Sequence, residues 1–78
     1  MTLLRFDTAL YDLVAVNRAV EAFSGCAKLV VTEQPGYVTI SVEAFDSGKQ
    51  QMIDGELGNY VLGATIDLRS GALGIAQR

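Results

Sequence analysis

Side chains that commonly carry out enzyme chemistry are scarce in this sequence. It contains no histidine, the most frequent general acid or base in enzymes. Its acidic residues are dispersed, and the nearest candidates for a catalytic pair, Asp54 and Glu56, would point in different directions on a helix because they are two positions apart. No cluster of His, Cys or carboxylate residues has the spacing of metal ligands. The residue types therefore predict a protein that is not an enzyme and that needs no metal or cofactor.

Cys26 is the single thiol of the chain and the best remaining candidate for a nucleophile. A nucleophilic cysteine needs a neighbouring base or positive charge that favours the thiolate, and the nearest basic residue in the sequence is Lys28. Free cysteines are among the most buried residues of proteins, so we expect Cys26 to be buried and structural. An enzyme that uses the Cys26 thiol is kept as a third hypothesis.

The composition excludes several classes of protein. The 78 residues predict one domain, and a share of 50% apolar residues excludes disorder for the bulk of the chain. The single cysteine excludes a disulfide framework. The six basic residues are scattered and the net charge is −3, so we expect no binding of nucleic acid or of an anionic membrane. Without an apolar run of about 18 residues or a signal-peptide pattern, we expect a cytoplasmic protein.

The first half of the chain shows the pattern of a strand, a helix and a hairpin. Residues 2–7 predict a strand, and apolar residues at three- and four-residue steps predict a helix over 13–24. Asp12 suits the N-cap of this helix, and Gly25 would end it in the left-handed conformation. Two alternating segments then flank Gln34-Pro35-Gly36, which has the pattern of a type II turn; the flanking strands are expected at 27–33 and 37–45.

Residues 50–68 have the apolar spacing of a second helix, but glycines interrupt it. Each of Gly55, Gly58 and Gly63 costs about 0.5–1 kcal/mol of helix stability relative to Ala. Such glycines would allow a close approach to the sheet or to a partner. Alternatively, the helix ends near Gly63 and residues 65–68 are extended. The last segment, residues 70–78, is interpreted as either a flexible tail or a short fourth strand.

These elements predict an α+β domain over residues 1–78 with the order β-α-β-β-α, in which both helices cover one face of a small sheet. The apolar share exceeds what so small a core is expected to bury, which indicates a homo-oligomer or a partner-bound subunit. The uncovered sheet face and polar positions of the second helix are the expected interface. The residues predicted for it are Tyr37, Thr39, Ser41 and Phe45, followed by Asn59 and Tyr60.

The sequence resembles the HxsD-like proteins of the His-Xaa-Ser repeat system. The resemblance rests on the pattern Phe6-Asp7-x-x-x-Tyr11 with the helix that ends in Phe23, on residues 56–62, and on Leu68-Arg69. It implies the same order of elements and an association with radical-SAM enzymes that modify a repeat-containing peptide. The chain would then be a non-catalytic accessory subunit whose partner is the radical-SAM enzyme or its substrate peptide.

The leading hypothesis is therefore a non-enzymatic interaction module that self-associates and binds a protein or peptide partner. It would do so with the open sheet face or by strand addition at a sheet edge. The alternative is a small oligomer that binds a small ligand in a pocket between subunits.

Overall fold

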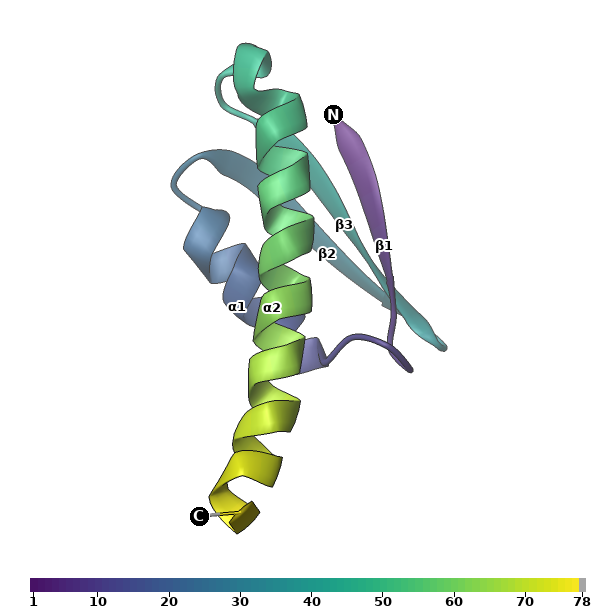
Figure 1. The fold of residues 1–78 in the computed structure, drawn as a ribbon. Helices are drawn as coiled ribbons and strands as arrows, with labels where there is room; N and C mark the ends of the chain where they lie inside the picture. The colour runs from purple at the N-terminus through teal and green to yellow at the C-terminus, as the bar shows by residue number, and fades with distance from the viewer. Residues whose placement is uncertain (78) are drawn as a thin grey trace.

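The computed structural model describes the backbone of residues 1–77 and the side chains of residues 1–69. Its elements follow the predicted order of strand, helix, strand, strand and helix, so the predicted α+β class is confirmed (Figure 1). They are β1 Thr2–Asp7, α1 Leu13–Phe23, β2 Ala27–Gln34, β3 Tyr37–Ala44, the 3₁₀ turn η1 Ser47–Lys49, and α2 Gln50–Gln77.

β3 is the central strand of a three-stranded antiparallel sheet with the order β1-β3-β2. Gln34 pairs with Tyr37 across the Pro35-Gly36 turn, and Gly36 has a φ of 85°, the positive value that a type II turn requires there. On the other side of the central strand, Phe6 of β1 lies opposite Val38. β1 and β2 are therefore parallel to each other, and α1 connects them by crossing over β3.

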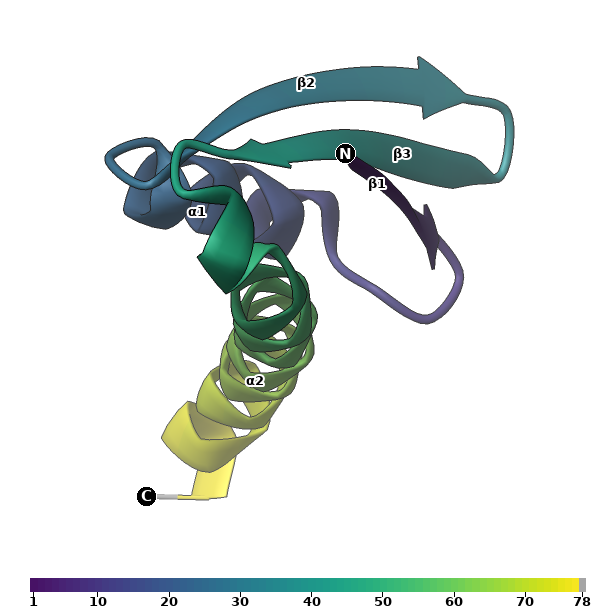
Figure 2. The same ribbon diagram turned by 90° about the horizontal axis from the view of Figure 1, so that it is seen from above.

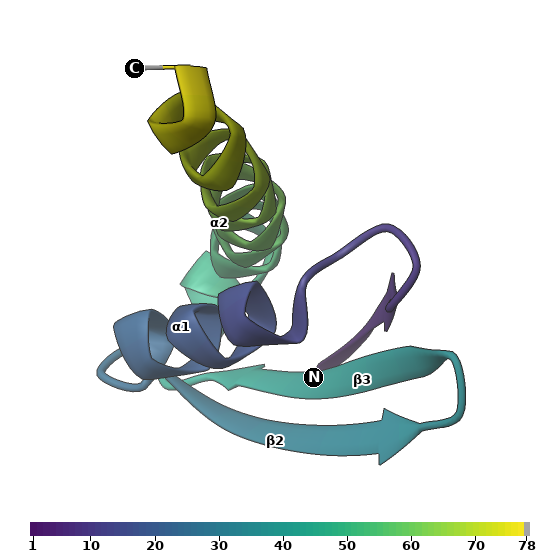
Figure 3. The ribbon, with the colours of Figure 1, turned by 90° about the horizontal axis from the view of Figure 1, so that it is seen from below.

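Both helices cover the same face of the sheet, as the sequence predicts (Figures 2 and 3). α1 contacts β2 and α2, while α2 also contacts β1 and β3. The core lies between the sheet and the helices, because alternate residues of β3 point inward and each helix turns one apolar stripe toward them. Its largest fully buried side chains are Val16, Val38, Ile40, Val42, Leu57 and Val61.

Polar groups fix both ends of α1. The Asp12 carboxylate accepts a hydrogen bond from the backbone N–H of Val14 at 2.9 Å, which confirms the predicted N-cap. The Asp12 N–H in turn donates to the hydroxyl of the buried Thr65 on α2 at 3.1 Å. At the other end the left-handed glycine cap is wrong: Ser24 is the C-cap in a right-handed conformation, and Gly36 is the one glycine with positive φ in the described backbone. The chain instead enters β2 through a turn in which the Cys26 N–H donates to the Phe23 carbonyl.

The side chain of Gln50 fixes the start of α2 to the edge of the sheet. Its Oε1 accepts from the Ala44 N–H at 2.8 Å, and its Nε2 donates to the Val42 carbonyl at 3.1 Å. β1 begins with Thr2 opposite Val42, so the Gln50 amide pairs with the edge of β3 at the point where β1 has no further residue. Nε2 also donates to Asp54 Oδ1 at 2.8 Å, and the Thr2 hydroxyl donates to Asp54 Oδ2 at 2.5 Å. The network joins β1, β3 and α2.

α2 is longer than the sequence predicts. It continues through Gly63, so the alternative of an extended segment at 65–68 is wrong. It also continues through residues 70–77, where no fourth strand forms; the alternative of a flexible tail over 70–78 stays a prediction. The expected close approach of these glycines to the sheet is wrong, because a Cβ added at Gly55, Gly58 or Gly63 would meet no atom of the described chain within 4 Å; the close approach to a partner stays a prediction.

Candidate interaction surface

The face of the sheet that points away from the helices is uncovered in the monomer (Figure 2). Strand alternation and the register assign its members. We call this surface the open sheet face; it comprises Leu3, Arg5, Asp7, Lys28, Val30, Thr32, Gln34, Tyr37, Thr39, Ser41 and Glu43.

Two exposed aliphatic side chains lie in one row across the open sheet face. Leu3 of β1 and Val30 of β2 both pair with Ser41 of the central strand. Leu3 is 68% exposed and Val30 is 50% exposed. The side chain between them, Ser41, is small and polar, so the row projects less from the sheet at its centre and is apolar at both ends. This arrangement can accept apolar side chains of a partner surface.

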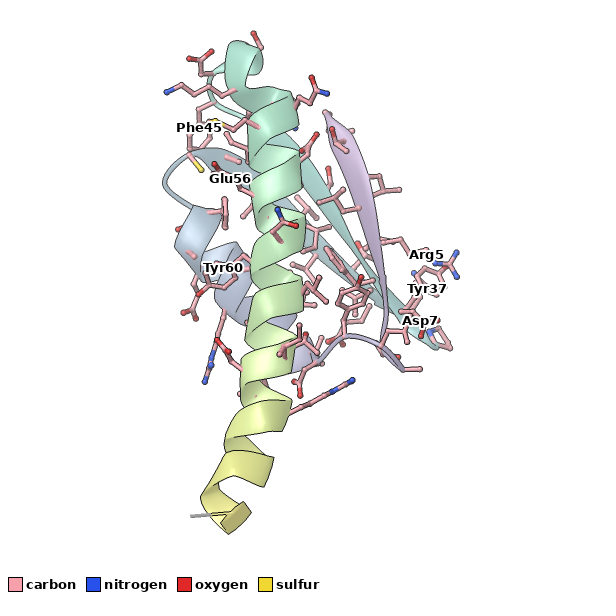
Figure 4. The ribbon with its side chains drawn as sticks, in the orientation of Figure 1. Arg5, Asp7, Tyr37, Phe45, Glu56 and Tyr60 are labelled. Atoms are coloured by element: carbon pink, nitrogen blue, oxygen red, sulfur yellow. The ribbon has the colours of Figure 1, made fainter. Side chains whose placement is uncertain are left out.

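Charged side chains surround this row and balance one another. Arg5 and Lys28 are positive, Asp7 and Glu43 are negative, and all four are exposed. Lys28 lies directly opposite Glu43 in the register, and Asp7 lies opposite Tyr37. The Arg5 guanidinium carbon lies 3.9 Å from the centre of the Tyr37 ring, a cation–π contact that keeps both side chains on this face (Figure 4). The open sheet face therefore has no net charge, although the whole chain carries −3.

The structure divides the six predicted interface residues among separate places. Tyr37, Thr39 and Ser41 lie together on the open sheet face, each half-buried. Phe45 follows the end of β3 and is 68% exposed, at the end of the sheet remote from Tyr37 (Figure 4). The remaining two residues are on α2.

Asn59 and Tyr60 lie on the helical side of the molecule and not on the open sheet face. Asn59 is exposed. The Tyr60 ring makes an edge-to-face contact with Phe23 of α1, with the ring centres 5.9 Å apart. Tyr60 is thus part of the contact between the two helices, and the predicted set does not form one surface.

Sequence reasoning missed Leu3, Arg5, Asp7, Lys28 and Val30 as members of the open sheet face. The signal that finds them is the alternation already used for β3, because the residues of β1 and β2 that face outward follow from the inward positions of their apolar neighbours. What the sequence does not supply is the strand order, which brings Leu3 and Val30 to either side of Ser41.

Cys26 is exposed, so the expectation that it is buried is wrong. Its Sγ lies 3.4 Å from the Phe23 carbonyl oxygen, to which it donates within the turn after α1. No group of three His, Cys, Asp or Glu side chains that could hold a metal ion occurs in the part of the chain that the structure describes.

In the same part of the chain, no helix combines the length and apolar character needed to cross a membrane.

No protein-family model matches the chain, and no curated protein or solved structure is significantly similar to it. The resemblance to HxsD-like proteins stays a prediction.

Proposed function

We propose that this chain is a non-catalytic interaction module that self-associates through its open sheet face. The observation that carries the proposal is the row of Leu3 and Val30 on a face that the helices leave uncovered. Exposed apolar side chains that lie together, rimmed by polar ones, are typical of interfaces.

The occupant that fits this face best is a second copy of the chain. A two-fold dimer brings the same surface of both copies together, so the surface must complement itself. The open sheet face carries two positive and two negative side chains, and a two-fold arrangement can place the opposite charges of the two copies together. Association through other surfaces would meet the negative charge that gives the chain its net −3.

The family resemblance supports a further partner, a radical-SAM enzyme or its repeat-containing substrate peptide. In this role the module would act as an accessory subunit. β1 and β2 are the outer strands of the sheet, and each has one edge that pairs with no strand in the described part of the chain. Such edges can accept an extended peptide as an additional strand.

Substitution of Val30 by Glu tests self-association. It adds a negative charge at one apolar end of the row, where two copies would bury it, so we expect Val30→Glu to be monomeric under conditions in which the wild type is dimeric. Val14→Glu is a matched control, because Val14 is also 50% exposed but lies on α1, which packs against the other face of the sheet.

Sedimentation equilibrium over a range of concentrations gives the mass of each protein. A dimeric wild type and Val14→Glu variant with a monomeric Val30→Glu variant support the proposal, provided that far-ultraviolet circular dichroism shows all three to be folded. A monomeric wild type, or a Val30→Glu variant that dimerises as well as the control, would contradict it.

A further inference from the structure

A pocket lies between the two helices, on the side of the molecule opposite the open sheet face. Its volume is about 310 Å³, and it is lined by Arg18 of α1 and by Tyr60, Gly63, Ala64 and Asp67 of α2. This volume is at the lower end of the range for sites that bind small molecules. The pocket is within one chain, unlike the site between subunits considered from the sequence.

Groups of opposite charge line this pocket on opposite sides. Arg18 projects from α1 and Asp67 from α2. Both side chains are exposed, and neither makes a side-chain hydrogen bond to another described residue. The guanidinium therefore remains available to an anion, and the carboxylate remains available to a cation.

Tyr60 and Gly63 shape the space between these charges. The edge-to-face contact with Phe23 holds the Tyr60 ring in place beside the pocket. A Cβ at Gly63 would meet no atom within 4 Å, so the glycine leaves open room in the pocket where any other residue would place a side chain. The glycine costs helix stability, and no turn or close packing in the described residues requires it.

We propose that this pocket binds a small zwitterion, a molecule that carries a carboxylate and an ammonium group on a short carbon skeleton, such as a free amino acid. Its carboxylate would pair with Arg18 and its ammonium with Asp67, while its carbon atoms would lie against the Tyr60 ring and over Gly63. A molecule with one of the two charges would satisfy only one side of the pocket. The inference is independent of the proposed self-association, which uses the other face of the sheet.

The test uses three zwitterions as probes: L-alanine, L-leucine and γ-aminobutyrate. Each is titrated to about 10 mM into the ¹⁵N-labelled wild-type protein, tenfold above a Kd of about 1 mM. We expect at least one probe to give saturable shifts of the backbone amide signals of residues 18, 60, 63 and 67. Sodium acetate and methylammonium chloride supply the two charges separately, and we expect each to bind at least tenfold more weakly.

Four variants examine the proposed contacts. Arg18→Gln and Asp67→Asn should each weaken binding of the zwitterion at least tenfold. Gly63→Leu fills the open space and should abolish binding. Gly55→Leu is its matched control, because Gly55 is also on α2 with no atom within 4 Å of an added Cβ but does not line the pocket.

Saturable shifts that Gly63→Leu removes and Gly55→Leu retains support the pocket. The absence of saturation with all three probes would overturn the proposal, as would equal binding of acetate or methylammonium. Dimerisation is measured on the same samples, so a pocket that fails to bind is distinguished from a protein that fails to self-associate.

Discussion

At the scale of single residues, Gln50 illustrates how one side chain can complete a sheet. Its amide pairs with the Ala44 N–H and the Val42 carbonyl, at the position where the pairing of β3 with β1 stops, opposite Thr2. Buried backbone groups without partners cost as much as a lost hydrogen bond, so the position demands a group that both donates and accepts. Glutamine offers both, on a side chain long enough to reach from the first residue of α2 to the strand edge.

Loss of the Gln50 amide should therefore destabilise the domain. Gln50→Ala leaves the Ala44 N–H and the Asp54 carboxylate without this partner, and we expect the free energy of unfolding to fall by about 1–3 kcal/mol. The adjacent Gln51 is exposed and makes no side-chain hydrogen bond in the described residues, so Gln51→Ala should change stability by less than about 0.5 kcal/mol. Urea denaturation measures both variants, and equal effects would show that the network does not contribute as argued.

At the scale of elements, burial decides where α2 continues. Ile53, Leu57, Val61 and Thr65 recur every four residues and are all buried, so the stripe that faces the core passes Gly63 without a break. Propensity alone made an end at Gly63 a reasonable alternative, and tertiary packing outweighs it. The prediction of a left-handed Gly25 at the end of α1 was wrong for a related reason. The sequence contains the glycine, but whether it adopts a positive φ depends on where the next strand lies.

The same distinction explains how much of the candidate surface could be predicted. Alternation along β3 places Tyr37, Thr39 and Ser41 on one face, and the structure confirms that these three share it. Asn59 and Tyr60 could not be placed in this way, because the side of α2 that meets α1 depends on the rotation of one helix against the other. The spacing of apolar residues specifies which stripe of α2 faces the core. It does not specify which residues of α1 lie next to the α2 residues that flank this stripe.

Glycines on the exposed side of α2 offer a direct test of helix energetics. Gly55 is exposed, lies in the helix interior and has open space at its Cβ position. Gly55→Ala should therefore raise the free energy of unfolding by about 0.5–1 kcal/mol, because alanine loses less backbone entropy on folding. Thermal and urea unfolding measure the change. A decrease in stability would mean that Gly55 has a role in packing that the monomer does not contain, such as close contact with a partner.

At the scale of the whole molecule, the fold is a single layer of helices on a single small sheet. A domain of this size buries a smaller share of its apolar surface than a large one, and here Leu3 and Val30 remain exposed on the uncovered face. If a second copy covered that face, the two sheets would pack against each other with a layer of helices on either side. The contact between the sheets would be an apolar interface in addition to the core of each chain. The stability of the domain and its association are therefore expected to be linked.

This linkage predicts that thermal stability depends on protein concentration. If the dimer is the native form and dissociates on unfolding, each tenfold increase in concentration stabilises it by about 1.4 kcal/mol of dimer. That amount corresponds to a rise in Tm of several degrees for a dimer of such small chains. We expect this rise for the wild type and for Val14→Glu, and a constant Tm for Val30→Glu, measured by circular dichroism over a hundredfold concentration range. A Tm that does not change with concentration for any of the three proteins would contradict this linkage. It would mean that association does not stabilise the folded chain.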